Sequence, residues 1–114
     1  MNKIQAIFLI VVSCLWLNIA CATEHVVTQD DKQFSEIFLK IEHDDVIRFV
    51  NLDNVEHKLT FTHRKLSSLE TEVMPGDSQA VVFSKPGVYD VKCDIHPHMK
   101  MTVFVPHIDV VMNQ

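Results

Sequence analysis

The sequence is poor in glycine, in tyrosine and tryptophan, and in clusters of basic residues. Two glycines among 114 residues, together with 47% hydrophobic residues, exclude a fibrous or linker-like chain and an intrinsically disordered one. A formal net charge of −5 and the lack of a basic run argue against nucleic acid or an anionic membrane as the partner. A chain of this length closes one hydrophobic core, so the composition predicts a single globular domain.

The chain begins with the features of an export leader. A short positive start precedes an apolar run, Ile4–Leu17, that is too short to span a bilayer comfortably. The motif Ala20-Cys21-Ala22 then supplies the small residues that signal peptidase prefers. Residues 1–22 are therefore predicted to be a cleaved signal peptide, and residues 23–114 a periplasmic domain without stable membrane insertion. Two alternatives remain open, an uncleaved membrane anchor and a lipoprotein acylated at Cys21.

Cleavage after Ala22 would change the balance of charged residues and of cysteines. It removes one lysine and no acid, so the net charge changes from −5 to −6. It also removes Cys14 and Cys21, which leaves Cys93 alone. A single cysteine in an exported protein cannot form an internal disulfide, so Cys93 is a free thiol, an intermolecular link or a metal ligand.

Short runs of β-branched and aromatic residues recur along the predicted mature chain, separated by turn signals that include Pro75-Gly76 and Pro86-Gly87. Such a series of short strands predicts an all-β fold, a Greek-key β-sandwich or barrel of about eight strands. His63–Leu69 is the one segment that suits a helical turn. The expected strands are His25–Thr28, Ile37–Ile41, Val46–Val50, Lys58–Thr62, Ala80–Phe83, Val88–Lys92 and Met101–Val105.

The residues with the most distinctive chemistry lie near the end of the chain, in the run Cys93-Asp94-Ile95-His96-Pro97-His98-Met99. Thiolate and thioether sulfur are soft ligands and imidazole is a borderline one, and together they suit copper. A loop between two strands would allow these side chains to surround one ion. Chance placement of His and Met at these two distances from a given cysteine has odds of about 0.3%, so the pattern is specific for its length.

A blue-copper site needs a second histidine, because its trigonal plane contains two His and one Cys, with a long axial Met. The best candidate is His57, which lies 36 residues before Cys93, follows a turn and opens an expected strand. His57 can meet the C-terminal loop only if the sandwich brings two strand ends together. The fold would then prepare the metal site.

These segments resemble those of the cupredoxins, the type 1 blue copper proteins, most closely the amicyanin, pseudoazurin and plastocyanin group. The resemblance covers roughly residues 34–105 and is carried by Phe49–Asp53 leading to His57, by Pro75-Gly76, by Pro86–Tyr89 and by the loop from Cys93 to Met99. The loop has the short form Cys-x-x-His-Pro-x-Met that amicyanin uses. The resemblance implies an eight-stranded Greek-key sandwich, one copper ion cycling between Cu(I) and Cu(II), and one-electron transfer in the periplasm.

By this resemblance the copper ligands are His57, Cys93, His96 and Met99, with no catalytic residue and no other cofactor. Met101 is the alternative axial ligand, although the shorter loop favours Met99. Lys58 and Asp94 occupy positions where the family usually has Asn and Thr or Ser. Either the two side chains form an ion pair across the ligand segments, or both are solvated.

Three functions remain open: an electron-transfer shuttle, a copper chaperone or storage protein with the same ligands, and a cupredoxin-fold interaction module. We favour the shuttle, which is not an enzyme and acts as a monomer. Its expected partner is a basic redox protein such as a c-type cytochrome, docking around His96 and His98. The acids expected to steer the encounter are Glu42, Asp44, Asp45, Asp53, Glu56, Glu70 and Glu72.

Overall fold

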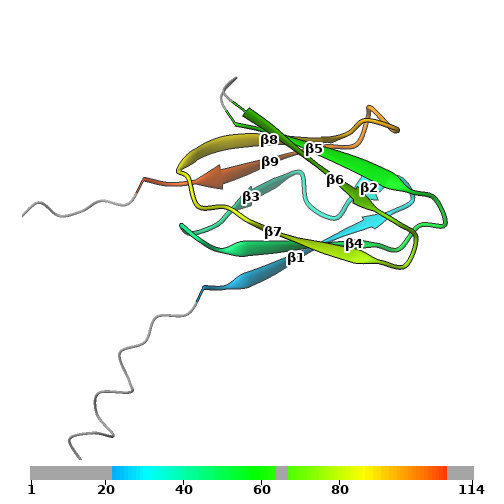
Figure 1. The fold of residues 1–114 in the computed structure, drawn as a ribbon, viewed down its shortest axis with the longest axis horizontal. Coiled ribbons are helices and arrows are strands. Elements are labelled where there is room, and N and C mark those ends of the chain that lie inside the picture. The colour runs from blue at the N-terminus through cyan, green and yellow to red at the C-terminus, as the bar shows by residue number, and fades with distance from the viewer. Residues whose placement is uncertain (1–21, 64–66, 108–114) are drawn as a thin grey trace, which may run out of the picture.

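The computed structural model describes residues 22–63 and 67–107, which form two β-sheets packed face to face (Figure 1). No helix occurs among these residues, and so none that is long and apolar enough to cross a membrane. One sheet has the order β2-β1-β4-β7 and the other β3-β9-β8-β5-β6. The strands are β1 Glu24–Asp30, β2 Gln33–Phe34, β3 Phe38–Lys40, β4 Val46–Asn51, β5 His57–His63, β6 Ser67–Val73, β7 Ser78–Val82, β8 Gly87–Cys93 and β9 Lys100–Val105.

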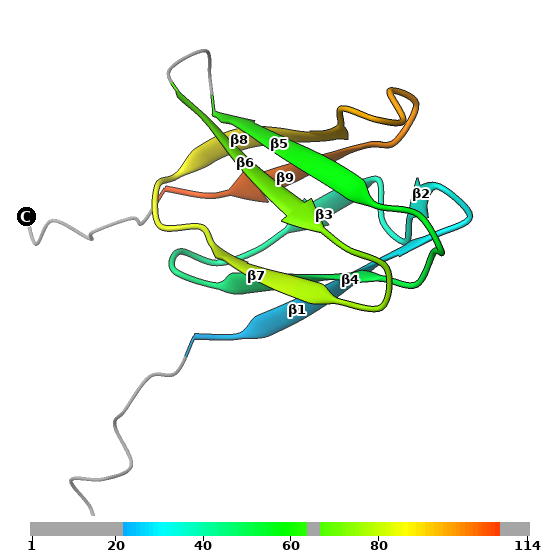
Figure 2. The ribbon, with the colours of Figure 1, turned by 45° about the vertical axis from the view of Figure 1, so that its right-hand side comes forward.

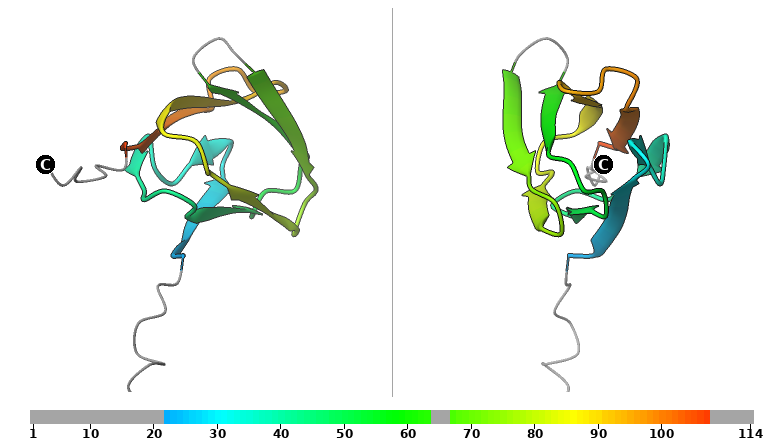
Figure 3. Two further views of the ribbon diagram at one scale, coloured as in Figure 1. Left: turned by 60° about the vertical axis from the view of Figure 1, so that its left-hand side comes forward. Right: turned by 90° about the vertical axis from the view of Figure 1, so that its right-hand side faces the viewer.

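The strand connections give a mixed β-sandwich. β1 pairs with β4 in parallel, and β3 pairs with β9 in parallel, while the remaining neighbours are antiparallel. The two layers are visible from other directions in Figures 2 and 3. The predicted all-β sandwich is thus confirmed, with nine strands in the described part of the chain where the sequence predicts about eight.

Aromatic side chains fill the centre of the sandwich. In β4, Ile47, Phe49 and Asn51 alternate with more exposed residues, as expected for a strand with one buried face. The Phe49 ring meets Phe61 of the opposite sheet edge to face, with 5.4 Å between centroids. Such edge-to-face pairs stabilise a core beyond the area that they bury.

Two strands were not expected from the sequence. Ser67–Leu69, which the sequence assigned to a helical turn, belongs to β6; residues 64–66 of that segment lie outside the described residues. β6 pairs along its length with β5, and tertiary pairing of this kind overrides a weak local preference. β2 has only two residues and pairs with the end of β1.

Three connections important for function lie at the same end of the sandwich. They are the turn between β1 and β2, the segment between β4 and β5, and the loop between β8 and β9 (Figures 1 and 2). Pairing of β5 with β8 aligns Leu59 with Cys93, so the start of β5 lies beside the end of β8. The fold therefore brings together the two ligand-bearing segments that are distant in sequence.

Asp45 anchors the other end of the sandwich. Its buried carboxylate accepts the Thr23 N–H at 3.0 Å and the Glu42 N–H at 2.9 Å, and it lies 2.9 Å from His25 Nε2. Hydrogen bonds from His25, Thr23 and Glu42 outweigh the effect of burial and hold the pKa of Asp45 below its usual value. This carboxylate ties the start of β1 to the turn before β4.

Replacing Asp45 by asparagine is expected to lower the free energy of unfolding by about 2 kcal/mol at pH 7, because the variant loses charge-assisted hydrogen bonds to a buried group. The folded-state pKa lies below the unfolded value of about 3.9, so the contribution of the carboxylate is complete above that value and is lost as pH falls through the folded pKa. The difference in free energy of unfolding between the wild type and Asp45→Asn should therefore become smaller below about pH 4.

Urea unfolding at several pH values measures this difference. The matched control is Asp44→Asn, since Asp44 is exposed and its positive φ of 67° suits asparagine. That control should unfold like the wild type to within about 0.5 kcal/mol. The role of Asp45 as an anchor would be contradicted if both variants lost the same free energy of unfolding. It would also be contradicted if the loss in Asp45→Asn did not depend on pH.

Candidate metal centre

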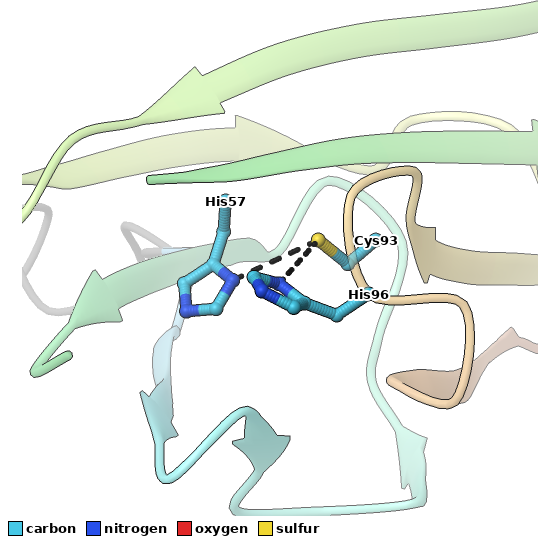
Figure 4. Close-up of side chains that lie close together, drawn as sticks. All are labelled: His57, Cys93 and His96. Atoms are coloured by element: carbon cyan, nitrogen blue, oxygen red, sulfur yellow. Dashed lines mark hydrogen bonds between the residues drawn. The ribbon is translucent and has the colours of Figure 1, made fainter. Parts of the chain in front are cut away.

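Three metal-binding side chains meet where β5 and β8 end. His57 is the first residue of β5, Cys93 is the last residue of β8, and His96 lies on the loop that follows (Figure 4). Cys93 Sγ lies 3.7 Å from His57 Nδ1 and 3.6 Å from His96 Nδ1. The three donor atoms all lie within 4.8 Å of one another. The structure thus brings together His57, Cys93 and His96, three of the four ligands predicted from the sequence. Their donor atoms lie close enough to bind one ion.

These spacings fit a single metal ion. Thiolate and imidazole ligands usually lie about 2.3 Å and about 2.0 Å from a first-row metal, so a tetrahedral or trigonal arrangement separates sulfur and nitrogen by about 3.5 to 3.7 Å. The observed spacings of 3.6 and 3.7 Å fall at this value. One soft sulfur with two imidazoles is a donor set that suits copper.

A carboxylate fixes the orientation of His57. His57 Nε2 lies 2.8 Å from Asp53 Oδ2, and the His57 side chain is fully buried. The ring therefore donates its Nε2 hydrogen to Asp53 and presents the Nδ1 lone pair toward Cys93, as metal-binding histidines commonly do. Burial opposes the charge on Asp53, but hydrogen bonds from Lys32 N–H, His57 and Asp31 N–H outweigh it and lower the pKa of Asp53.

His96 is kept in the form that binds metal. Burial lowers the pKa of His96 below its ordinary value, and the nearby Lys32 ammonium lowers it further, against the opposing effect of the Asp53 carboxylate. A neutral imidazole has a free lone pair for a metal, whereas a protonated one does not. His96 also remains partly exposed, in contrast to His57 and Cys93, which are both 0% exposed.

Hydrogen bonds close the loop around Met99. Its N–H donates to the His96 carbonyl at 2.9 Å, and its carbonyl accepts the Cys93 N–H at 3.1 Å. Met99 is buried at this closure, next to Cys93 in the fold. Met101 is also buried, but it lies in β9 opposite Val91, two residues before Cys93. Met99 thus lies on the loop that carries His96, whereas Met101 lies within β9.

The alternative of an ion pair between Lys58 and Asp94 is wrong. The Lys58 ammonium lies 3.6 Å from Glu70, while the Asp94 carboxylate accepts the Thr60 hydroxyl at 2.8 Å. The two residues are nevertheless joined through the backbone, since the Asp94 N–H donates to the Lys58 carbonyl at 2.8 Å. A backbone bond thus links the two ligand segments, where sequence reasoning considered only the side chains.

Asp53 is the functional residue whose role the sequence reasoning missed. The sequence analysis places it in the segment Phe49–Asp53 and among the steering acids but gives it no role at the metal, although its place four residues before His57, in a turn, is a usable signal. Its contact with the imidazole became evident only when the turn was folded.

The fold of this chain is shared with known proteins. A family model described as a cupredoxin-like domain matches residues 3–105. The chain belongs to the cupredoxin-like family. None of the curated protein sequences compared with this chain matches it.

Among solved structures, this cupredoxin is similar in fold to amicyanin. A reduced Cu(I) form of a proline-to-glycine mutant is 22% identical, with a TM-score of 0.66 over 78% of this chain and 87% of that one. An oxidised proline-to-alanine mutant gives the same values. A copper-containing nitrite reductase from Thermus scotoductus is 23% identical with a TM-score of 0.67, and the match covers 78% of this chain but 23% of the enzyme.

These results support one copper ion as the cofactor of this chain, as the sequence predicts. They also set a limit on function. The cupredoxin fold is typical of electron carriers, but the nitrite reductase shows that it also occurs within enzymes.

Proposed function

We propose that this cupredoxin is a type 1 blue copper protein that transfers single electrons in the periplasm as a monomer. The observation that carries the proposal is the preformed set of donors, in which His57 and Cys93 are fully buried while His96 is partly exposed. A buried ion with one exposed ligand edge suits electron exchange with a protein partner. The proposed export follows from the leader predicted at residues 1–22.

The proposed copper ligands are His57, Cys93, His96 and Met99. Cys93 would provide a thiolate, His57 and His96 would provide Nδ1, and Met99 would provide a thioether. Copper, when bound, supplies the exchange of one electron between Cu(I) and Cu(II). Asp53 holds His57 in the metal-binding orientation, and the buried side chains limit the access of water to the site.

We propose no catalytic residue. A shallow hollow of about 490 Å³ lies on the sheet formed by β5, β8 and β9, but none of the three metal-binding side chains lines it. A substrate in that hollow would be separated from the donors by the sheet. A second hollow of about 220 Å³ is lined by His98 and Met99 but by none of the three metal-binding side chains. An electron carrier needs no substrate cavity, and we propose a carrier and not an enzyme.

The end of the sandwich that bears the ligands has the composition of a weak docking surface. Leu52, Met74 and Ile95 expose 58, 47 and 48% of their surface there, on the connections after β4, β6 and β8. Asp31, Glu56 and Glu72 lie on segments at the same end. A small apolar surface beside acids suits a short-lived complex with a basic c-type cytochrome, the partner that we propose.

Some acids that the sequence suggested for docking do not lie at this end. Glu42, Asp44 and Asp45 precede β4, whereas the ligand segment follows β4, so they lie at the opposite end of the sandwich. The Asp45 and Asp53 carboxylates are engaged in hydrogen bonds. We therefore assign charge steering to Asp31, Glu56 and Glu72, which lie on segments at the ligand end.

Stopped-flow electron transfer to a basic cytochrome c tests the proposed function and partner together. The rate should fall by on the order of 10-fold between low salt and about 0.3 M salt, because ions screen the attraction. With an acidic cytochrome the rate should rise or stay flat. A double charge reversal, Glu56→Lys with Glu72→Lys, should weaken the salt dependence, while Glu42→Lys at the far end should not. No electron transfer to either cytochrome would contradict the carrier function.

A further inference from the structure

The turn between β1 and β2 contains a lysine in a backbone conformation that lysine rarely adopts. It contains two residues, since Asp30 pairs with Gln33, and both of them have positive φ angles, 53° at Asp31 and 54° at Lys32. Aspartate is common at the first position of such turns, but the second position usually holds glycine, because long side chains rarely adopt positive φ. Contacts from outside the turn hold it in place.

The first contact comes from the segment that carries His57. Asp53 Oδ1 accepts the Asp31 N–H at 2.7 Å, and Asp53 Oδ2 accepts the Lys32 N–H at 3.0 Å. The same Oδ2 lies 2.8 Å from His57 Nε2. Asp53 is itself fixed, since its N–H donates to Asn51 Oδ1 at 2.8 Å. One carboxylate thus joins the turn to an imidazole of the metal centre.

The second contact comes from the loop that carries His96 and Met99. His98 Nε2 donates to the Lys32 carbonyl at 3.0 Å, across 66 residues of sequence. Lys32 is therefore held by its N–H from the His57 segment and by its carbonyl from the loop after Cys93. Neither contact uses the Lys32 side chain.

We propose that the Asp31–Lys32 turn is a clasp that fixes the two ligand-bearing segments relative to each other, with Asp53 and His98 as positioning residues. The proposal rests on the proposed copper function. The clasp holds His57 and His96 against Cys93 before copper binds, so the side chains need little rearrangement when the ion binds or changes its charge. Lys32 keeps its positive φ because its N–H is bound by one ligand segment and its carbonyl by the other.

His98 is a suitable residue for the test, because its side chain is exposed and it is not one of the proposed copper ligands. His98→Phe removes the hydrogen-bond donor and keeps an aromatic ring, while His98→Gln keeps a side-chain N–H and serves as the rescue variant. His43→Phe is the matched control, at a turn on the opposite end of the sandwich. Asp53→Asn is the second variant, since it turns one of the two acceptor oxygens into a donor that faces an N–H of the turn.

Amide hydrogen exchange of copper-free protein gives the first measurement. The Lys32 and Asp31 amides should exchange about 10-fold faster in His98→Phe and faster still in Asp53→Asn, with partial recovery in His98→Gln and no change in His43→Phe. The second measurement is the transfer of Cu(I) to a chelator, which should be about 10- to 100-fold faster in the same variants.

The two readouts separate the clasp from the copper function. Wild-type exchange and wild-type Cu(I) transfer in both His98→Phe and Asp53→Asn would overturn the clasp while the copper site stands. If the wild type does not bind copper, the proposed function fails, and amide exchange of the copper-free variants still tests the clasp by itself.

Discussion

Replacing Cys93 by serine is expected to abolish the colour of the copper-loaded protein. In the wild type, charge transfer from a thiolate to Cu(II) should give an intense band near ~600 nm or a neighbouring one near ~450 nm. Serine is nearly the same size as the fully buried cysteine, so the fold is retained while the soft ligand is lost. Copper affinity should fall by more than about 100-fold, because a direct ligand contributes at least as much as the groups that orient it.

Visible absorption spectra of purified protein titrated with Cu(II) measure this effect. Met101→Leu is the control, since it alters a core side chain beside the site and keeps all four proposed ligands, and it should remain coloured. Wild-type protein that stays colourless with Cu(II) and binds Zn(II) tightly would contradict a blue-copper site. A coloured Cys93→Ser variant would show that the thiolate of Cys93 is not the source of the band.

Strands with one buried face and the ligand loop were predictable from the sequence, because both depend on local patterns. Buried and more exposed residues alternate along the six residues of β4. An alternation of this kind predicts a strand with one buried face. Cys93, His96 and Met99 lie within seven residues, so their chemistry is visible without the fold. His57 needed only the assumption that two strand ends meet, which the pairing of β5 with β8 provides.

The parts that were missed depend on tertiary contacts. β6 forms an edge of its sheet and only Leu69 and Val73 among its seven residues are apolar, so its alternation is a weak strand signal. The turn at Asp31 and Lys32 lacks the glycine that usually follows aspartate in a two-residue turn with positive φ. Lys58 points to Glu70 because β6 lies beside β5, a pairing that was not expected.

Retention of copper during redox cycling is the second result with a large expected effect. The donors come from two segments that lie 36 residues apart in the sequence, and His57 and Cys93 are fully buried. A departing ion must therefore leave a site closed by the loop hydrogen bonds of Met99 and by the contact between His57 and Asp53. A metal held in this way should change its charge without leaving, whereas a copper chaperone must release Cu(I) readily to a partner.

The measurement that tests the central claim most directly is repeated reduction and reoxidation at neutral pH in the presence of a modest Cu(I) chelator. Ascorbate reduces the protein, ferricyanide reoxidises it, and the visible band and the chelator complex are followed together. An electron carrier should recover its full absorbance over many cycles, with no copper on the chelator. Transfer of copper to the chelator within the first reduction, with loss of the band on reoxidation, would contradict the account and identify a copper-delivery protein.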